Sequence, residues 1–277
     1  MSNKVAIIIP ARYASTRLPG KPLVKILGKE MLLHVWEIAN SIQINNDYVK
    51  AFVATDDERI RVFCLQNSIN CIMTSETCNT GTERVAEAVE KISHNGFTPE
   101  FIINLQGDNP LCPTWFLQEL INEFNRNESI EIATTVVNLT WEDLDTMRDN
   151  KVSTPFSGTC VVFDANRNAM YFSKNIIPAI RKEENVRLKS SYSPVYRQPG
   201  LYGYSLKSLR KIKILTDGFY EKYEGLEQLN FLENGLKIKC VEVDYKDFNK
   251  LNSISGIDSP EDVVRAENIL KEYKKIY

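Results

Sequence analysis

The chain has 277 residues, of which 34 are basic and 36 acidic, so its formal net charge is −2, and 43% of its residues are hydrophobic. This balance is typical of a globular protein with a buried core, and it gives no bulk attraction to nucleic acid. No apolar run approaches the roughly 20 residues that span a bilayer, and the short apolar N-terminus is not typical of a signal peptide. We therefore expect neither a membrane nor a nucleic-acid partner.

The six cysteines and two histidines narrow the location and the chemistry further. The cysteines form no CxxC pair and no metal-binding spacing with a histidine. Dispersed thiols of this kind are typical of a reducing compartment, so we expect the protein in the cytoplasm. With only His34 and His94 available, a catalytic triad built on histidine is disfavoured.

The first half of the chain alternates buried strands with amphipathic helices. Strands are predicted at Val5–Pro10, Ala51–Ala54, Asn70–Met73, Phe101–Leu105 and Ile132–Val137, and helices at Glu30–Ser41, Asp57–Asn67, Thr82–Ile92 and Pro113–Phe124. Such an alternation predicts an α/β fold with a doubly wound, mostly parallel sheet.

The second half of the chain is less regular. Strands are predicted at Cys160–Phe163, Leu201–Tyr204 and Lys237–Val243, and helices at Gly225–Asn234 and Pro260–Tyr273. Ser259 before Pro260 is a strong helix N-cap signal, whereas the polar, charged stretch Arg181–Tyr196 predicts a mobile loop. No repeat or linker divides the chain, so we expect one domain over residues 1–277 with an elaborated C-terminal half.

The connection that follows the first strand, Pro10–Pro22, carries three cations, two hydroxyls and a glycine. It leaves the carboxyl end of a parallel strand, where α/β folds bind their ligands. Arginine forks and a lysine ammonium are suited to phosphate oxygens, and glycine permits close approach of the backbone. The stretch matches neither the P-loop nor the dinucleotide fingerprint, so it predicts another kind of phosphate-binding loop.

Two acidic positions predict a metal site beside this loop. Asp108 follows the buried strand Phe101–Leu105 within the sequence NLQGDNP, where a Mg²⁺ ion bridging phosphate oxygens would lie. Asp258 stands just ahead of the last predicted helix and could complete the same site from far along the chain. Each acid also has an ordinary explanation as a turn or helix-start residue.

Seven segments together resemble the family of CMP-KDO synthetases, the 3-deoxy-manno-octulosonate cytidylyltransferases. They are Ile8–Leu23 (IIPARYASTRLPGKPL), Thr80–Ala88 (TGTERVAEA), Asn104–Leu111 (NLQGDNPL), Tyr171–Pro178 (YFSKNIIP), Gly200–Tyr204 (GLYGY), Glu227–Gly235 (EQLNFLENG) and Gly256–Asp262 (GIDSPED). They occur in the family's order and cover essentially the whole chain, and the first of them is the most specific.

The resemblance implies a CTP-dependent cytidylyltransferase with a nucleotidyltransferase fold of the glycosyltransferase-A-like type. It implies transfer of CMP to the anomeric hydroxyl of a 3-deoxy-ulosonic acid, with KDO as the expected acceptor, in lipopolysaccharide biosynthesis. It also implies a homodimer and Mg²⁺ as cofactor. The implied catalytic residues are Arg12, Lys21 and Asp108, and the implied metal ligands are Asp108 and Asp258.

The remaining implied residues bind the two substrates. Those expected to bind the nucleotide are Ala11, Arg12, Ser15, Arg17, Lys21, Thr80, Gly81, Arg84 and Gln106. Those expected to bind the acceptor are Gln106, Lys174, Gln198, Tyr202, Glu227 and Gln228.

The chain departs from the family pattern on the acceptor side. Asn109 stands where the family has a carboxylate, Lys174 where it has arginine and Gln198 where it has histidine; the stretch before Cys160 also differs. A lysine does not replace the bidentate grip of an arginine. A different acceptor is therefore an alternative: an amino-substituted KDO, another ulosonic acid or a phosphonate. A non-catalytic nucleotide-binding protein is a further one, disfavoured by the intact nucleotide and metal positions.

Overall fold

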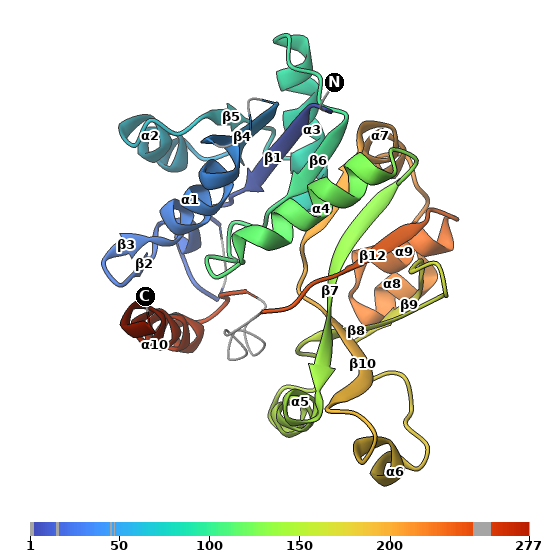
Figure 1. The fold of residues 1–277 in the computed structure, drawn as a ribbon. Coiled ribbons are helices and arrows are strands. Elements are labelled where there is room, and N and C mark those ends of the chain that lie inside the picture. The colour runs from blue at the N-terminus through green and yellow to red at the C-terminus, as the bar shows by residue number, and fades with distance from the viewer. Residues whose placement is uncertain (1–2, 15–16, 45, 47, 246–255, 277) are drawn as a thin grey trace. The chain divides into compact units, whose positions relative to one another are not determined.

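The computed structural model describes residues 3–14, 17–44, 46, 48–245 and 256–276. Contacts between residues divide the chain into two compact units, Met1–Asn125 with Ile254–Tyr277, and Arg126–Ser253. Figure 1 shows both units and labels most of their helices and strands. A division into contact units does not test whether the chain is one functional domain, so the single domain over residues 1–277 stays a prediction.

The first unit is built on four parallel strands in the order β5–β4–β1–β6. Their bounds are β1 (Val5–Pro10), β4 (Val49–Thr55), β5 (Cys71–Met73) and β6 (Phe101–Asn104). Every residue of β1 is buried, because the strand lies between β4 and β6 and is apolar on both faces. Ile8 pairs with Phe52 on one side and with Asn104 on the other, so the carboxyl ends of these strands lie at one edge of the sheet.

Helices connect these strands, which confirms the predicted alternation. The other elements of the unit are η1 (Lys21–Leu23), β2 (Lys25–Ile26), β3 (Lys29–Glu30), α1 (Met31–Ile44), α2 (Glu58–Gln66), α3 (Gly81–His94), α4 (Thr114–Arg126) and α10 (Pro260–Ile276). The predicted last helix packs back onto this unit, where Ile257 and Ala266 form an apolar cluster with Leu18, Ile26 and Met31. The final helix is thus part of the core around the loop that follows β1.

The second unit is built on a mainly antiparallel sheet centred on β7. Its strands are β7 (Ile132–Thr140), β8 (Thr159–Phe163), β9 (Ala169–Ser173), β10 (Tyr192–Gln198), β11 (Tyr202–Ser205) and β12 (Ile238–Glu242). β10 and β11 pair antiparallel with β7, whereas β12 pairs parallel with it; β8 joins β10 to β9. This is the elaborated half that the irregular sequence pattern indicated.

Several elements of the second unit were not predicted. Its helices are α5 (Trp141–Ser153), α6 (Glu183–Arg187), α7 (Leu206–Ile212), α8 (Phe219–Glu224) and α9 (Glu227–Glu233), of which only α9 was predicted. Helix α5 has a weak apolar pattern, and its buried residues are Trp141 and Leu144. The sequence signal for this helix lies at its start, where the side chains of Thr140 and Asp143 form a reciprocal capping box.

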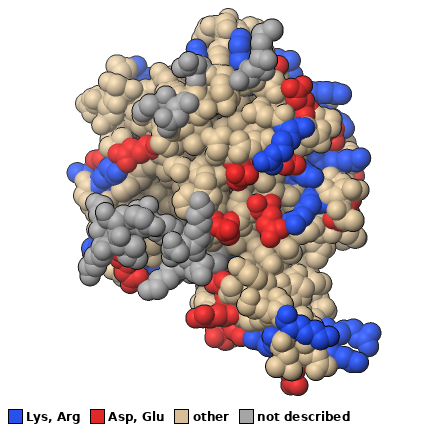
Figure 2. Space-filling model, viewed as in Figure 1, with Lys and Arg blue, Asp and Glu red and all other residues tan. Residues whose placement is uncertain are grey.

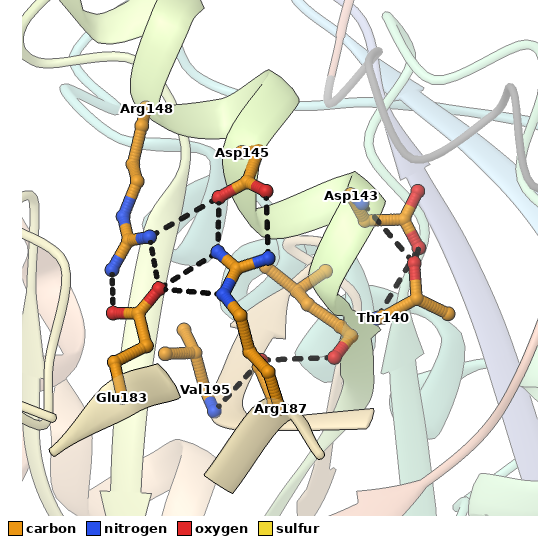
Figure 3. A network of polar contacts seen from close by, with 9 residues as sticks. Thr140, Asp143, Asp145, Arg148, Glu183, Arg187 and Val195 are labelled. Atoms are coloured by element: carbon orange, nitrogen blue, oxygen red, sulfur yellow. Dashed lines mark hydrogen bonds and ion pairs between the residues drawn. The ribbon is translucent and has the colours of Figure 1, made fainter. Parts of the chain in front are cut away.

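The prediction of a mobile loop over Arg181–Tyr196 is wrong, because this stretch contains α6 and most of β10. β10 pairs with β7 on one side and β8 on the other. Ahead of it, Arg148 and Arg187 share the carboxylates of Asp145 and Glu183, so that α6 is joined to α5 (Figure 3). The polar composition that suggested a loop is therefore the composition of an ion-pair network and of a paired strand.

This network gives a pH-dependent contribution to stability. Hydrogen bonds from Arg148 and Arg187 lower the pKa of the Glu183 carboxyl from 4.5 to about 2. A group whose pKa is lowered by folding stabilises the fold above its unfolded pKa and loses this effect as the pH falls. We expect Glu183→Gln to lower the free energy of unfolding by about 1 kcal/mol or less at pH 7, since the pair lies near the surface. The difference from wild type should shrink between pH 4.5 and pH 2, as measured by urea unfolding.

The neighbouring Glu184→Gln is the matched control, since among the described residues Glu184 forms no ion pair. Its unfolding free energy should differ little from wild type at every pH. If the two variants showed the same pH dependence, the network would not stabilise the fold.

Acidic and basic side chains lie close to one another on the face shown in Figure 2, in agreement with the small net charge of the chain. In the described part of the chain, every helix is too short or too polar to cross a membrane.

Candidate active site

The chain leaves the buried strand β1 at Pro10 and turns back on itself before Lys21. The Ala11 N–H donates to the Ala54 carbonyl at 2.9 Å, and the Gly20 N–H donates to the Tyr13 carbonyl at 3.2 Å, which closes the loop. Gly20 has a φ of +66°, a conformation that favours glycine, and it leads directly into η1. Lys21 therefore begins a helical turn whose direction is determined by a glycine. Ser15 lies outside the described residues.

The ring of Tyr13 supports this loop from behind. The guanidinium carbon of Arg59 lies 3.3 Å from the ring centroid. The Nε and Nη2 atoms of the same guanidinium donate to the Asp57 carboxylate at 3.0 and 2.7 Å. A Cβ atom at Gly20 would also lie 3.1 Å from the hydroxyl end of the ring. The ring is thus enclosed between Gly20 and the start of α2, a contact that no local sequence pattern indicates.

A second loop reaches the same edge of the sheet from β6. Gly107 packs directly against the end of β1, because a Cβ atom there would lie 2.7 Å from the Pro10 carbonyl oxygen. Any side chain at this position would push the turn away. The close approach brings Asp108 beside the loop that follows β1, as we predicted from its position just after a buried parallel strand.

A third segment arrives from the far end of the chain. The Ile257 N–H donates to the Asp108 carbonyl at 2.9 Å, so Asp258 is held next to Asp108. Ser259 is the cap of α10: its Oγ accepts the Asp262 N–H at 3.3 Å, while its own N–H donates to the Asp262 carboxylate at 3.1 Å. The predicted helix start at Ser259 and Pro260 is confirmed.

The ammonium of Lys21 joins the three segments. Its Nζ lies 2.6 Å from Oδ2 of Asp108 and 2.9 Å from Oδ1 of Asp258, and Nη2 of Arg17 lies 3.2 Å from Oδ2 of Asp258. Burial alone would lower the pKa of Lys21, but the charges and hydrogen bonds of Asp108 and Asp258 outweigh it, so the pKa is raised above its ordinary value. Lys21 therefore remains charged in this site at neutral pH.

Arg84, on α3, lies at the base of the site and is fully buried. Its Nη2 donates to Oδ2 of Asp56 and its Nη1 donates to Oγ1 of Thr74, both at 2.5 Å. Its Nε atom is buried with no hydrogen-bond partner among the described residues. Two of its five N–H donors are thus bonded to Asp56 and Thr74, and the buried Nε atom is a donor left for the predicted role of Arg84 as a nucleotide ligand.

These segments enclose a cavity of about 390 Å³ in the first unit. The predicted residues that line it are Ala11, Arg12, Arg17, Lys21, Gly81, Arg84, Gln106, Asp108 and Asp258. Thr80 lies just outside, where its Oγ1 accepts the Glu83 N–H at 3.0 Å and caps α3. The structure therefore brings together, in one cavity, residues that are up to about 250 positions apart in the chain.

The carboxylates of this cavity fit a magnesium ion by their chemistry. Asp108 and Asp258 already hold one cation, the Lys21 ammonium, between them. Over the described ranges, no group of three or more His, Cys, Asp or Glu gathers as a closed ligand set. Two carboxylates are the kind of incomplete set that Mg²⁺ uses together with water and substrate phosphates.

Five predicted acceptor residues lie in the second unit; Gln198 and Gln228 are buried, and the partly exposed Tyr202 lies beside Gln198. Nε2 of Gln228 donates to Oε1 of Gln198 at 3.3 Å, and Nε2 of Gln198 donates to Oγ1 of Thr134 at 2.9 Å. Burial raises the pKa of the Tyr202 hydroxyl well above its ordinary value, although a hydrogen bond with Gln198 opposes this effect. Glu227 lies close enough to Tyr202 to raise that pKa further. The sixth residue, Gln106, belongs to the first unit.

Lys174 is the remaining acceptor residue of the second unit, and both its N–H and its carbonyl form hydrogen bonds. Its N–H donates to Oε2 of Glu224 at 2.7 Å, and its carbonyl accepts the Lys151 ammonium at 2.6 Å. Its own ammonium donates to Oγ1 of Thr159 at 3.3 Å, and it has no ion-pair partner among the described residues. Burial lowers the pKa of Lys174. A partly buried ammonium that forms no ion pair within the described ranges is suited to an anionic ligand.

Sequence reasoning missed the residues that support these sites. Asp56 follows the carboxyl end of β4, a position typical of functional side chains, and could have been found from that signal. Lys151, Thr159 and Glu224 gave no such signal, because their roles depend on contacts across β8, β9 and α8.

Comparison with known proteins agrees with this geometry. The family described as cytidylyltransferase matches residues 6–238. A 3-deoxy-manno-octulosonate cytidylyltransferase from Maricaulis maris (strain MCS10) is 39% identical over 96% of each chain. An 8-amino-3,8-dideoxy-manno-octulosonate cytidylyltransferase from Shewanella sp. (strain W3-18-1) is 36% identical, covering 96% of this chain and 98% of the relative.

The fold agrees with a solved relative as well. The structure of a CMP:2-keto-3-deoxy-manno-octonic acid synthetase complexed with CTP superposes with a TM-score of 0.79 at 29% identity, covering 98% of this chain and 99% of the other. The predicted α/β nucleotidyltransferase fold is thereby confirmed. The protein therefore belongs to the 3-deoxy-manno-octulosonate cytidylyltransferase family.

Proposed function

We propose that this protein transfers CMP from CTP to the anomeric hydroxyl of KDO and releases pyrophosphate. The observation that carries the proposal is the cavity at the end of β1, in which Arg12, Arg17 and Lys21 meet Asp108 and Asp258. This arrangement offers cations for a triphosphate and carboxylates for a metal ion. The similarity to curated cytidylyltransferases over nearly the whole chain supports the choice of CTP.

In this reaction the acceptor hydroxyl attacks the α-phosphorus, and the bond to the leaving pyrophosphate breaks. Arg12 and Lys21 would bind phosphate oxygens and stabilise the charge of the leaving group, while Gly81 and Gly107 permit close approach of the backbone. Asp108 and Asp258 would hold Mg²⁺, which when bound supplies further neutralisation of phosphate charge. Transfer of this kind depends on positioning and charge more than on a general base, which agrees with the scarcity of histidine.

The acceptor residues of the second unit favour an anionic sugar acid. Lys174 offers an ammonium that forms no ion pair with any other described residue, and Gln198, Gln228 and Tyr202 offer amide and hydroxyl groups for sugar hydroxyls. An 8-amino-substituted KDO is the second candidate. It is favoured by Lys174 and Gln198 standing where the family has arginine and histidine, and by the similarity to a cytidylyltransferase named for that acceptor.

The proposed setting follows from the proposed substrate. CMP-KDO is an activated sugar for lipopolysaccharide, so we place the enzyme in lipopolysaccharide biosynthesis in the cytoplasm. The dispersed, unpaired cysteines agree with a reducing compartment. We also propose a homodimer, as the family resemblance implies.

The decisive experiment measures pyrophosphate release from CTP with KDO, its 8-amino analogue, another ulosonic acid and a phosphonate. We expect KDO to be the best acceptor, and Lys174→Arg to raise its kcat/KM, because an arginine restores a bidentate grip on the carboxylate. If the 8-amino analogue is the true acceptor, the same substitution should lower its kcat/KM by about 10- to 200-fold.

The exposed Lys207→Arg is the matched control and should change no acceptor. Absence of pyrophosphate release with every acceptor would refute CMP transfer. Identical kcat/KM values for all acceptors in wild type and Lys174→Arg would show that Lys174 does not contact the acceptor.

A further inference from the structure

The two carboxylates proposed to hold Mg²⁺ are bound, in the structure, by a side chain of the protein itself. The Lys21 ammonium lies 2.6 Å from an oxygen of Asp108 and 2.9 Å from an oxygen of Asp258. We infer that Lys21 competes with the metal ion for these carboxylates and releases them when nucleotide phosphates bind its ammonium. This inference rests on the proposed function, because it takes its metal ligands and phosphate-binding lysine from there.

The competition follows from shared oxygens. One ammonium makes charge-assisted hydrogen bonds to both carboxylates, and a divalent cation bound to the same carboxylates would repel it. The side chain of Lys21 is only 17% exposed, so water screens this repulsion little. Asp258 is further engaged by Arg17 through its other oxygen. The carboxylates proposed as metal ligands are therefore largely occupied by the chain's own cations.

Arg12 differs from these cations, although it lines the same cavity. Its Nη2 atom is buried without a hydrogen-bond partner in the described part of the chain, and no ion pair joins it to Asp108 or Asp258 there. Arriving phosphates can therefore bind Arg12 without breaking a contact, whereas they draw Lys21 away from its carboxylates. Each ligand then favours the other: phosphates free the carboxylates for the metal, and the metal frees Lys21 for phosphates.

The test measures Mn²⁺ binding to the protein in the absence of nucleotide. Electron paramagnetic resonance reports the concentration of free Mn²⁺. Wild type should bind Mn²⁺ weakly, because only the fraction of molecules with free carboxylates is competent. Lys21→Met, which keeps the length of the side chain without its charge, should bind Mn²⁺ at least about 10-fold more tightly. Lys21→Gln should behave alike, and circular dichroism checks that both variants are folded.

Two further variants distinguish the possible failures. Arg12→Met removes a charge that lies in the same cavity but does not contact the carboxylates, so it should tighten Mn²⁺ binding much less. An equal effect would show that only the net charge of the cavity matters, and it would overturn the inference. Lys21→Met binding no more tightly than wild type would also overturn it, while leaving the metal site intact. If Mn²⁺ bound to no variant, or bound to Asp108→Asn as well as to Lys21→Met, the proposed metal ligands themselves would be wrong.

Discussion

Asp108→Asn is expected to lower kcat/KM for CMP transfer by at least about 10³-fold, because it removes both a proposed metal ligand and a partner of Lys21. Excess chelator should abolish turnover of the wild type to a similar extent, and added Mg²⁺ should restore it. The fold should persist, since the contact of this residue with Ile257 is made by the backbone carbonyl of Asp108. The measurement is pyrophosphate release, with circular dichroism as a check of folding.

Asp217→Asn makes the same change of charge on an exposed loop of the second unit and should leave kcat/KM unchanged. Full activity of the wild type in excess chelator would contradict the metal assignment. Near-normal activity of Asp108→Asn would contradict the role of this carboxylate, whichever cation it holds.

The second large effect is expected on stability. Asp56→Ala should lower the free energy of unfolding by about 3 kcal/mol, because it leaves the fully buried guanidinium of Arg84 without its carboxylate. This loss of unfolding free energy lies at the lower end of the range for breaking a buried ion pair, because the Asp56 side chain is itself 19% exposed. Urea unfolding at pH 7 measures the change.

The double variant Asp56→Ala with Arg84→Met should be more stable than Asp56→Ala alone, because it removes the uncompensated charge as well. Glu58→Ala removes an exposed carboxylate on the same stretch; it is the control and should destabilise the fold far less than Asp56→Ala. If Asp56→Ala were as stable as Glu58→Ala, the buried pair would not support the base of the cavity.

Short-range patterns were sufficient for the first unit. The apolar run of β1, the glycine and cations after it, and the capping signal at Ser259 each depend on neighbouring residues, and each was predicted within a few positions of its place. The same patterns predicted that Lys21 and Asp108 follow neighbouring strands, because parallel strands present their carboxyl ends at one edge.

Patterns of the same kind failed in the second unit. The stretch Arg181–Tyr196 is polar, and its order depends on partners in α5, β7 and β8 that lie tens of residues away. Helix α5 had its capping box as a signal, but its sparse apolar residues concealed it. An ion-pair network and a sheet register are long-range properties, so composition alone gave the wrong interpretation.

The sequence by itself therefore determined the fold class and the family, and it predicted the residues of the nucleotide side, since these depend on local motifs and their order along the chain. Only the tertiary structure decided how those residues are paired. It joined Asp258 to Asp108 through Lys21, bound the guanidinium of Arg84 to Asp56 and Thr74, and left the Lys174 ammonium without an ion pair among the described residues. The physical reason is that a charge has a partner only when folding brings distant segments within hydrogen-bonding distance, and no local pattern records that distance.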